Sequence, residues 1–460
     1  MKGSESIMSE VIKIMMWISD FIWGWPLLIS ISCTALFLSK RLRFFQFTKF
    51  CYIIRSTLGN SFSISKGRGN ISPLQACCTA LASTLGVGNI AGVSMAIAIG
   101  GPGAVFWMWL VALMGLIVKF SEITLGVAYR EEDLDTHIYH GGFYWYVKQG
   151  LGEKWKWMGL LWAILLGCAM LFAPAVQINS VVGAINSSYN VNPLMIGVLF
   201  AVLMAIVLVG GVKRIAHFAV LVVPTLTIIY IGVCTFVLIK YASSIPSTII
   251  MIMRYAFTPA SASGGFTGAT ILMTIRWGLA RGTYSNEAGT GMAPLAHSSA
   301  RVIHPVQQGM WGIVEVFLDT MVICTLTALV ILCSGVWDSG LSGAALTACA
   351  FGNAFGSQLV GTIFVTVIIA FLSFTTALIN VYYGEICVSI LNGRRFILIY
   401  RILGCMFAVI GAIGALNTLW NLFDFFFGLC TLLNLYVLLL MHKQIYSLVR
   451  EYMEHYHQKK

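Results

Sequence analysis

The stretch Leu81–Ala104, LASTLGVGNIAGVSMAIAIGGPGA, is apolar enough to lie within a membrane, yet small and polar residues interrupt it. Gly86 and Gly88 stand in its middle, beside Thr84 and Asn89. Glycine inside a helix costs about 1 kcal/mol relative to alanine, and a buried amide needs hydrogen-bond partners. We therefore expect the helix to break here. Freed backbone groups survive at membrane depth only inside protein or beside a polar cavity, so the break predicts a small-ion or small-solute site.

The same pattern occurs again in the second half of the chain. Residues 89–96 read NIAGVSMA and residues 286–293 read NEAGTGMA, so both fit N-x-A-G-x-x-M-A. A glycine and a threonine lie just upstream of each copy, Gly282 and Thr283 in the second. Coincidence among common small residues is the alternative. Paired interrupted helices in corresponding halves mark the binding site of many secondary transporters, and we expect a second break near Thr283.

Composition assigns the chain to the membrane. Hydrophobic residues make up 58% of the 460 residues, charged residues only 10%, and the mean hydropathy is +0.87, which no soluble core accommodates. The net charge of +11 does not indicate nucleic-acid binding, because the basic residues alternate between loops. The 12 cysteines lie mostly in apolar runs, which predicts buried hydrophobes without disulfides or metal. No cofactor and no obligate protein partner is expected.

The apolar runs predict an all-α protein with about eleven transmembrane helices. We expect them at 17–39, 72–99, 104–128, 157–187, 192–210, 215–239, 264–295, 306–334, 358–391, 396–414 and 417–441. The first span stands outside the repeat, and an odd number of spans per half inserts the halves in opposite orientation. The expected units are 1–70, an extra span with a cytoplasmic interfacial segment; 71–240 and 264–441, the inverted repeats; 241–263, an extracytoplasmic loop; and 442–460, a tail. The segments 241–263 and 335–357 are expected to be surface helices or lids.

The loop charges predict the orientation. With the segment 40–70 placed in the cytoplasm, the cytoplasmic loops and tail collect 20 Lys and Arg residues and the opposite side collects 4. The positive-inside rule then puts the C-terminus in the cytoplasm and the N-terminus outside, in a multi-pass protein of the cell's inner (plasma) membrane. The first apolar run reads as a retained span, since no small-residue cleavage site follows it.

Several motifs resemble one family of transporters. Residues 100–109 read GGPGAVFWMW, and residues 278–300 read GLARGTYSNEAGTGMAPLAHSSA. These stretches are similar to the alanine or glycine:cation symporter family, also called sodium:alanine symporters. The resemblance extends from about residue 70 to residue 440. It implies a LeuT-type fold of five plus five spans, no enzymatic activity, and import of small neutral amino acids with sodium as the co-transported ion.

The resemblance also implies two cation sites. Thr84 and Asn89 would contribute oxygen ligands to one. The second would take the carbonyl groups of Ala82 and Leu85 together with residues of the ninth span, where Leu372, Thr375 and Thr376 stand at i, i+3 and i+4 on one helical face. The alternative for the two threonines is that their hydroxyls bond back to the preceding helical turn.

For the amino acid, the resemblance implies that the carboxylate meets the positive end of the half-helix that begins at Gly86, Val87 and Gly88. The ammonium would take carbonyl groups around the second break, from Gly282, Thr283 and Ser285. Gln177 lies mid-span, and the resemblance implies that it faces the substrate. An interhelical hydrogen bond is the alternative for Gln177.

Two positions depart from the family pattern. Asn380 stands where a tryptophan is frequent, and Pro174 where an asparagine is frequent. A smaller and more polar wall at position 380 predicts tolerance for a polar neutral amino acid such as serine or glutamine. A proton-coupled mechanism through Glu287 and, from another class, a channel are the alternatives. The other ionisable residues in spans, Lys119, Glu122 and Arg281 among them, are expected to form gating or structural ion pairs.

Overall fold

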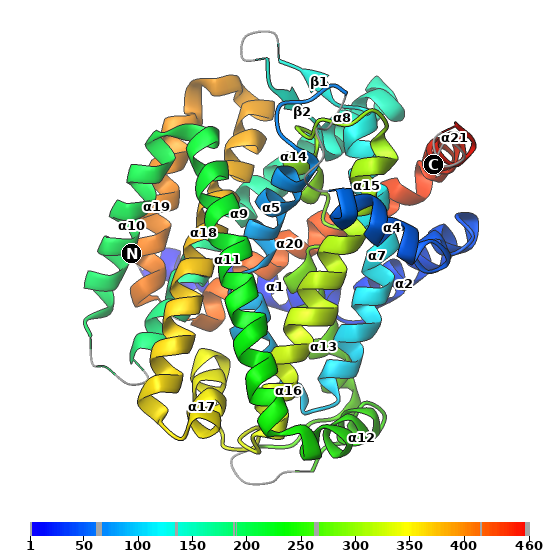
Figure 1. Ribbon diagram of the computed structural model, residues 1–460. Coiled ribbons are helices and arrows are strands. Elements are labelled where there is room, and N and C mark those ends of the chain that lie inside the picture. The colour runs from blue at the N-terminus through cyan, green and yellow to red at the C-terminus, as the bar shows by residue number, and fades with distance from the viewer. Residues whose placement is uncertain are drawn as a thin grey trace.

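The computed structural model describes residues 2–60, 67–133, 137–186, 189, 191–261, 266–414 and 416–455. Helices dominate these residues (Figure 1), joined by one hairpin of two short antiparallel strands, β1 (Glu131–Glu132) and β2 (Tyr139–His140). The fold is therefore all-α, as the apolar runs predict. We refer to the end of the molecule that carries β1, β2 and α8 as the hairpin end, and to the opposite end, which carries α12 and α17, as the α12–α17 end (Figure 1).

The helices of the first half are α1 (Lys2–Ile22), α2 (Trp25–Arg41), α3 (Phe45–Thr48), α4 (Phe50–Thr57), α5 (Pro73–Thr84), η2 (Gly88–Gly92), α6 (Val93–Gly100), α7 (Ala104–Ala128), α8 (Phe143–Gly150), α9 (Lys156–Asn186), α10 (Pro193–Val209) and α11 (Gly211–Lys240). Those of the second half are α12 (Ile245–Tyr255), α13 (Ile271–Asn286), α14 (Ala293–His297), α15 (Pro305–Val316), η5 (Phe317–Cys324), α16 (Thr325–Cys333), α17 (Gly343–Phe355), α18 (Gln358–Asn392), α19 (Ile397–Ile413), α20 (Leu416–Leu440) and α21 (His442–His455). Single-turn 3₁₀ helices lie at Leu58–Asn60, Glu153–Trp155, Ala242–Ser244 and Gly393–Phe396.

The number of helices able to cross a membrane differs from the expected eleven. Within the described residues, seven helical stretches are long and apolar enough, or eight if the bent pair α5 and η2–α6 counts as one span. One stretch, 358–413, covers two predicted spans, and α10 falls among the shorter apolar helices. The count of about eleven is thus not confirmed, although helices occupy each predicted span.

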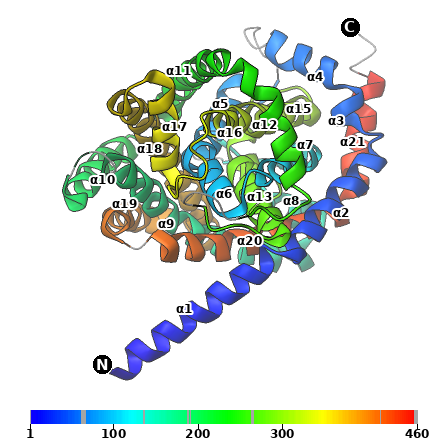
Figure 2. The ribbon, with the colours of Figure 1, turned by 90° about the horizontal axis from the view of Figure 1, so that it is seen from below.

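The first predicted span is not one helix. α1 and α2 meet at Trp23 and Gly24, where Gly24 is non-helical (φ −87°, ψ −131°). Pro26 lies in the first turn of α2, a position that tolerates its missing N–H. Figure 2 shows α1 extending away from the body of the molecule. The sequence between 17 and 39 therefore forms two helices.

The core is built around the helices that carry and precede the two motif copies. Seen from the α12–α17 end, α5, α6 and α13 lie near the centre, with α9, α11, α18, α19 and α20 around them (Figure 2). α18 packs along α9, and α7 packs against both α13 and α15. All residues of the second motif copy, and all of the first except the partly buried Met95, are buried as a result. The site must therefore be assembled by contacts between these central helices.

The two segments expected to form surface helices do contain short helices, α12 and α17, at the same end (Figure 1). α17 is attached to the helix that follows the first motif. The Ser94 hydroxyl donates to the Gly343 carbonyl at 2.7 Å, and the Thr347 hydroxyl donates to the Ile90 carbonyl at 3.2 Å. α17 therefore covers the half-helix η2–α6 from the α12–α17 end.

Candidate functional site

The first motif breaks its helix where the sequence predicts. α5 ends at Thr84, and Leu85 is extended (φ −78°, ψ 90°). The chain resumes as the wide helical turn η2 and continues as α6, with a bend of 51° between the two halves. Gly86 is required at the bend because a Cβ there would lie 2.5 Å from Thr376 Oγ1 and 3.1 Å from Gln177 Oε1. The break thus needs a residue without a side chain.

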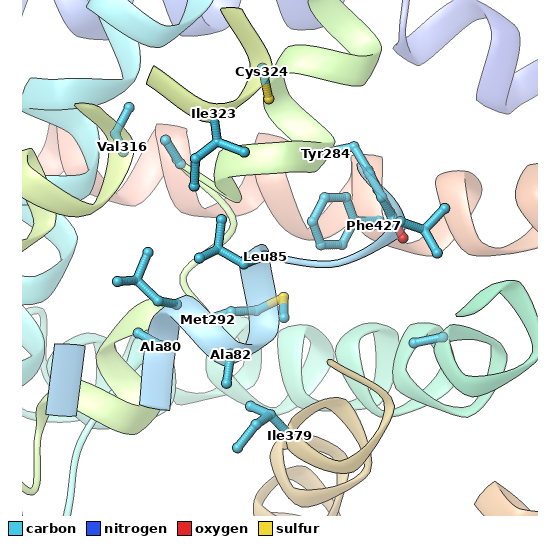
Figure 3. Close-up of a cluster of buried hydrophobic side chains, with 14 of the residues drawn as sticks. Ala80, Ala82, Leu85, Tyr284, Met292, Val316, Ile323, Cys324, Ile379 and Phe427 are labelled. Carbon is cyan, nitrogen blue, oxygen red and sulfur yellow. The ribbon is translucent and has the colours of Figure 1, made fainter. Parts of the chain in front are cut away.

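A threonine of α18 meets the carbonyl groups that the break frees. Thr376 Oγ1 lies 3.0 Å from the Ala82 carbonyl oxygen and 3.2 Å from that of Leu85. The neighbouring Thr375 hydroxyl donates instead to the Leu372 carbonyl of its own helix at 2.7 Å. Thr376 therefore joins the predicted group, whereas Thr375 adopts the alternative bond to the preceding turn. Figure 3 shows Ala82 and Leu85 at this end of α5.

Side-chain amides meet the N–H groups on the other side of the break. The Gly86 N–H donates to Asn89 Oδ1 at 3.2 Å, and the Val87 N–H donates to Gln177 Oε1 at 3.4 Å. Gln177 in turn donates through Nε2 to the Tyr284 hydroxyl at 3.3 Å. Gln177 therefore lies at the first break and makes the interhelical hydrogen bond that was its alternative role, whereas its contact with a substrate stays a prediction. We call the groups around this break, Ala82, Leu85, Gly86, Val87, Gln177 and Thr376, the break site.

The two motif asparagines converge on one short segment of η5. Asn89 Nδ2 donates to Asp319 Oδ1 at 2.7 Å and to Ser285 Oγ at 3.0 Å. The Ser285 hydroxyl donates to Asp319 Oδ2 at 2.6 Å, and Asn286 Nδ2 donates to the neighbouring Thr320 hydroxyl at 3.2 Å. All five residues are buried. The tertiary structure thus places the second motif copy beside the first around a carboxyl group.

Asp319 is one of the ionisable residues in the spans, for which gating or structural ion pairs are predicted, but it accepts hydrogen bonds from the neutral side chains of Asn89 and Ser285. Its signal was a carboxyl group inside an apolar span, which typically faces the interior of a helix bundle. Thr84, which was expected beside Asn89, is not in this cluster, since its hydroxyl bonds to the Leu81 carbonyl at 3.3 Å within α5. A hydroxyl that faces its own helix is the common arrangement for threonine in membrane helices.

The second break lies later than expected. Residues 282–285 are helical, and α13 continues to Asn286 before an irregular segment that spans 287–292. Gly282 serves close packing, since a Cβ there would lie 2.5 Å from Val111 Cγ1 of α7. The chain turns instead at Glu287 (φ 55°) and at the two glycines that follow, Gly289 (φ 88°) and Gly291 (φ 80°). The prediction of a break at Thr283 was therefore wrong by a helical turn.

Buried charges hold both ends of this second break. The Lys119 ammonium donates to the Asn286 carbonyl at 2.8 Å, at the negative end of α13, and lies 3.1 Å from Glu315 Oε1. Glu122 Oε2 accepts the Gly291 N–H at 3.0 Å. A cation at the carbonyl end of a helix and a carboxylate at freed N–H groups are both electrostatically favourable. The predicted ion pairs inside the spans are thus present, with Lys119 and Glu315 as partners.

We expect Lys119→Met to destabilise the folded protein by about 3–5 kcal/mol, because it removes the buried ammonium group that faces Glu315 and leaves this carboxylate with only the His297 ring, 3.1 Å from its Oε2. Thermal denaturation in detergent measures the effect. Lys156→Met is the matched control: Lys156 pairs with Glu153 at 3.6 Å on the surface, so the control should change stability by only about 0.5 kcal/mol. The double variant Lys119→Met/Glu315→Gln should recover part of the loss. Equal denaturation midpoints for Lys119→Met and Lys156→Met would contradict this role.

Asn380 lies at the junction of both breaks. The Ser83 hydroxyl, one residue before the end of α5, donates to Glu287 Oε1 at 2.7 Å and lies 3.1 Å from Asn380 Oδ1. Ser83, Glu287 and Asn380 are all buried. The departure from the family pattern at position 380 therefore adds an amide to a polar group that connects α5, α18 and the start of the second break.

Comparison with known proteins agrees with this geometry. The chain matches the model of the sodium:alanine symporter family over residues 8–460. It is 35% identical over 444 residues to the sodium/alanine symporter AgcS of Methanococcus maripaludis, covering 95% of this chain and 96% of that protein. It is 35% identical over 437 residues to the probable sodium/glutamine symporter GlnT of Bacillus subtilis, covering 94% and 89%. Its fold resembles the crystal structure of MhsT in complex with L-phenylalanine, with a TM-score of 0.57, 15% identity, and coverage of 82% and 90%.

Proposed function

The chain belongs to the sodium:alanine symporter family and is an amino-acid symporter, and from this premise we propose that it couples import of a small neutral amino acid to the inward sodium gradient. Transport would proceed by alternating access around the break site. The observation that carries the proposal is the first break, where α5 frees two carbonyl groups beside Thr376 and the following half-helix presents two N–H groups. One place thus offers oxygens for a cation and donors for an anion.

We assign one sodium ion to the carbonyl side of the break site. Sodium is a hard cation that takes oxygen ligands, and backbone carbonyl and hydroxyl oxygens are neutral ligands of this kind. The Thr376 hydroxyl already lies 3.0 Å from the Ala82 carbonyl oxygen and 3.2 Å from the Leu85 carbonyl oxygen. The Leu372 carbonyl and the Thr375 hydroxyl, paired at 2.7 Å on the same helix, would complete the set.

The second proposed cation position is the cluster around Asn89. Ser285 and Asp319 supply oxygens there, and the hydrogen bonds of Asn89 hold both in place. Thr84 takes no part in this version of the site, because its hydroxyl faces Leu81. The competing mechanism is proton coupling through Glu287, which lies 2.7 Å from the Ser83 hydroxyl. Uptake driven by a pH gradient in the absence of sodium would favour that mechanism.

The amino acid would lie across the break. Its carboxylate would take the N–H groups of Gly86, Val87 and Gly88, at the positive end of the half-helix, with Gln177 beside them. Its ammonium would take carbonyl oxygens of the last turn of α13, within Gly282–Ser285. The Thr283 carbonyl already accepts the Glu287 N–H at 2.8 Å, so the neighbouring carbonyl groups are the better acceptors.

Uptake by proteoliposomes tests the proposal. The purified protein is reconstituted with an inward gradient of sodium, and uptake of tritiated L-alanine is compared with sodium replaced by choline. We expect saturable accumulation that requires sodium and is collapsed by a sodium ionophore. Uptake that never exceeds equilibrium would instead indicate a channel, which cannot concentrate its solute. Equal uptake in choline would refute sodium coupling.

We expect the polar group at Asn380 to broaden substrate choice. Unlabelled serine and glutamine should compete with labelled alanine, as one relative's description as a probable sodium/glutamine symporter also suggests. Asn380→Trp should weaken competition by glutamine about 10-fold or more while alanine is retained, because a larger apolar wall excludes the longer side chain and leaves its amide unpaired. The full panel contains D- and L-amino acids. Competition by glycine and alanine alone in the native protein would refute the role of Asn380.

We also propose the membrane arrangement that the charges predict. The protein would be a multi-pass protein of the cell membrane with the hairpin end and the C-terminus in the cytoplasm. In this arrangement Arg130, at the hairpin end, donates to the carbonyl groups of Ser298 and Ala300 at 2.7 Å each. The two halves 71–240 and 264–441 would be the inverted repeats. Labelling of cysteines introduced at the two ends, in sealed vesicles, tests the orientation.

A further inference from the structure

A cavity of about 310 Å³ lies beside the break site, between α1, α6, α13 and α20. None of the residues that define the break site lines it. Four charged and two aromatic residues on its wall carry the argument: Asp20, Arg276, Trp277, Arg281, Trp420 and Asp424. Arg276 and Asp20 form an ion pair with half-exposed side chains, whereas the Arg281–Asp424 pair is 4% and 11% exposed. The cavity therefore leads from a solvated ion pair to a buried one.

Only one nitrogen of the buried Arg281 guanidinium donates a hydrogen bond within the described residues. Arg281 Nη2 donates to Asp424 Oδ2 at 2.9 Å. Its Nε and Nη1 atoms have no hydrogen-bond partner among the described residues. The guanidinium lies 4.3 Å from the ring centre of Trp420 and 5.3 Å from that of Trp277, so cation–π contacts fix its plane. A buried donor without a partner costs about 1–3 kcal/mol, and more for a charged group.

The chemistry of this wall matches a zwitterion. The unpartnered Nε and Nη1 groups of Arg281 point in different directions, so each offers a separate charge-assisted hydrogen bond to a carboxylate; a bidentate pair uses Nη2 with one of them, as Arg401 Nε and Nη2 do on Glu385. Asp424 stands next to the guanidinium and Asp20 nearer the mouth, and either carboxylate is an acceptor for an ammonium group. With two guanidinium and two carboxylate groups, the wall carries no net charge. A free amino acid satisfies both signs at once, whereas a simple anion or cation leaves one unmatched.

One aromatic side chain separates this cavity from the break site. The Arg281 guanidinium lies 5.6 Å from the ring centre of Tyr284, whose hydroxyl accepts the hydrogen bond from Gln177 of the break site. The Tyr284 ring also packs against Trp420, with ring centres 4.7 Å apart, and Phe423, at 5.4 Å. Figure 3 shows Tyr284 close to Phe427 on α20. Tyr284 therefore contacts both the guanidinium group of the cavity and the amide group of the break site.

We propose that the cavity is a second binding site for the zwitterionic amino acid, with Arg281 as the carboxylate receptor, occupied before the molecule reaches the break site. The inference rests on the proposed function for the identity of the ligand. Binding of the amino acid in this cavity needs no bound cation, because the cavity wall already carries both positive and negative side chains. Binding in the cavity should therefore be independent of sodium, unlike binding at the break site.

Equilibrium binding of tritiated L-alanine and L-glutamine, assayed separately on purified protein, tests the proposal. In sodium we expect two molecules per protein for the transported amino acid, and in choline one. Arg281→Lys keeps the charge but removes the two unpartnered donors Nε and Nη1, so it should bind one molecule in sodium and none in choline. Arg401→Lys is the matched control. It alters another Arg–carboxylate pair, with Glu385, away from both sites, and should bind as the native protein does.

A second variant tests the cavity independently, in case Arg281→Lys loses binding because it misfolds. Ala280→Phe fills the cavity from its wall without touching a charge, and it should also lose the binding seen in choline. In addition, Asn421→Cys places a thiol on the wall, and L-alanine or L-glutamine in choline should slow its reaction with a charged thiol reagent by at least 5-fold.

The outcomes separate the two proposals. The second site is refuted if the native protein binds one molecule in sodium and none in choline, and if the amino acid does not protect the thiol of Asn421→Cys. Sodium-coupled transport would still stand in that case. Sodium-independent binding that Arg281→Lys abolishes, in a protein without sodium-dependent uptake, would support the second site and refute the proposed function.

Discussion

Thr376→Val will raise the sodium concentration needed for half-maximal uptake by about 10- to 100-fold, since a hydrogen bond or ligand to a charged group contributes about 1.5–3 kcal/mol. Valine keeps the shape of threonine and removes only the oxygen. That oxygen is the one group of α18 placed between the Ala82 and Leu85 carbonyl groups. Initial uptake rates measured over a range of sodium concentrations in proteoliposomes give the sodium concentration for half-maximal uptake directly.

Two other residues of α18 that carry hydroxyl groups serve as controls for this result. Ser389→Ala removes a hydroxyl that bonds only to the Ile386 carbonyl in its own helix, so it should leave the sodium dependence unchanged. Thr375→Val should have a smaller effect than Thr376→Val, because the Thr375 hydroxyl must first leave the Leu372 carbonyl to reach an ion. If Thr376→Val behaves as Ser389→Ala does, the cation site is not at the first break.

Gly86→Ala should reduce uptake by more than about 100-fold, the largest loss expected from a single methyl group in this chain, because a misplacement of about 1 Å at a functional centre costs that much. A Cβ at position 86 would lie 2.5 Å from Thr376 Oγ1, nearer than a Cβ atom approaches another heavy atom, and 3.1 Å from Gln177 Oε1. Either Thr376 or the bend must move. Both consequences displace the carbonyl and N–H groups that the break presents.

The control is Gly183→Ala on α9, the helix that carries Gln177. A Cβ at position 183 would meet nothing within 4 Å, so uptake and stability should be unchanged. Uptake and the denaturation midpoint are measured on both variants. A fully active Gly86→Ala protein with normal sodium dependence would show that the first break does not bind the transported species.

Much of the fold follows from local sequence. Runs of about 20 apolar residues require helices in a membrane, because no other segment satisfies its own backbone hydrogen bonds there. The first break is equally local. Gly86 and Gly88 weaken the helix, Thr84 and Asn89 supply short-range partners, and the chain bends at Leu85 and Gly86 as expected. The two N-x-A-G copies likewise pointed to the two places where helices are interrupted.

The prediction from local sequence misplaced the second break because a glycine such as Gly282 can have either of two effects on a helix. A glycine weakens a helix, but it also permits a neighbouring helix to approach closely, and at position 282 the approach of Val111 on α7 decides the outcome. The break moves to Glu287, where Lys119 and Glu122 from α7 satisfy the freed carbonyl and N–H groups on either side. Those two partners are more than 150 residues distant in sequence.

The sequence by itself determined that this chain is a membrane protein of helices, which family it resembles, and where the helix of the first motif copy breaks. Only the tertiary structure decided that Asp319 joins the two motif asparagines, that Lys119 pairs with Glu315, and that Arg281 keeps half its guanidinium free beside a cavity. The physical reason is the range of the interactions. Helix propensity and hydrophobic spacing act within a few residues, whereas the partner of a buried charge is set by which helices pack together.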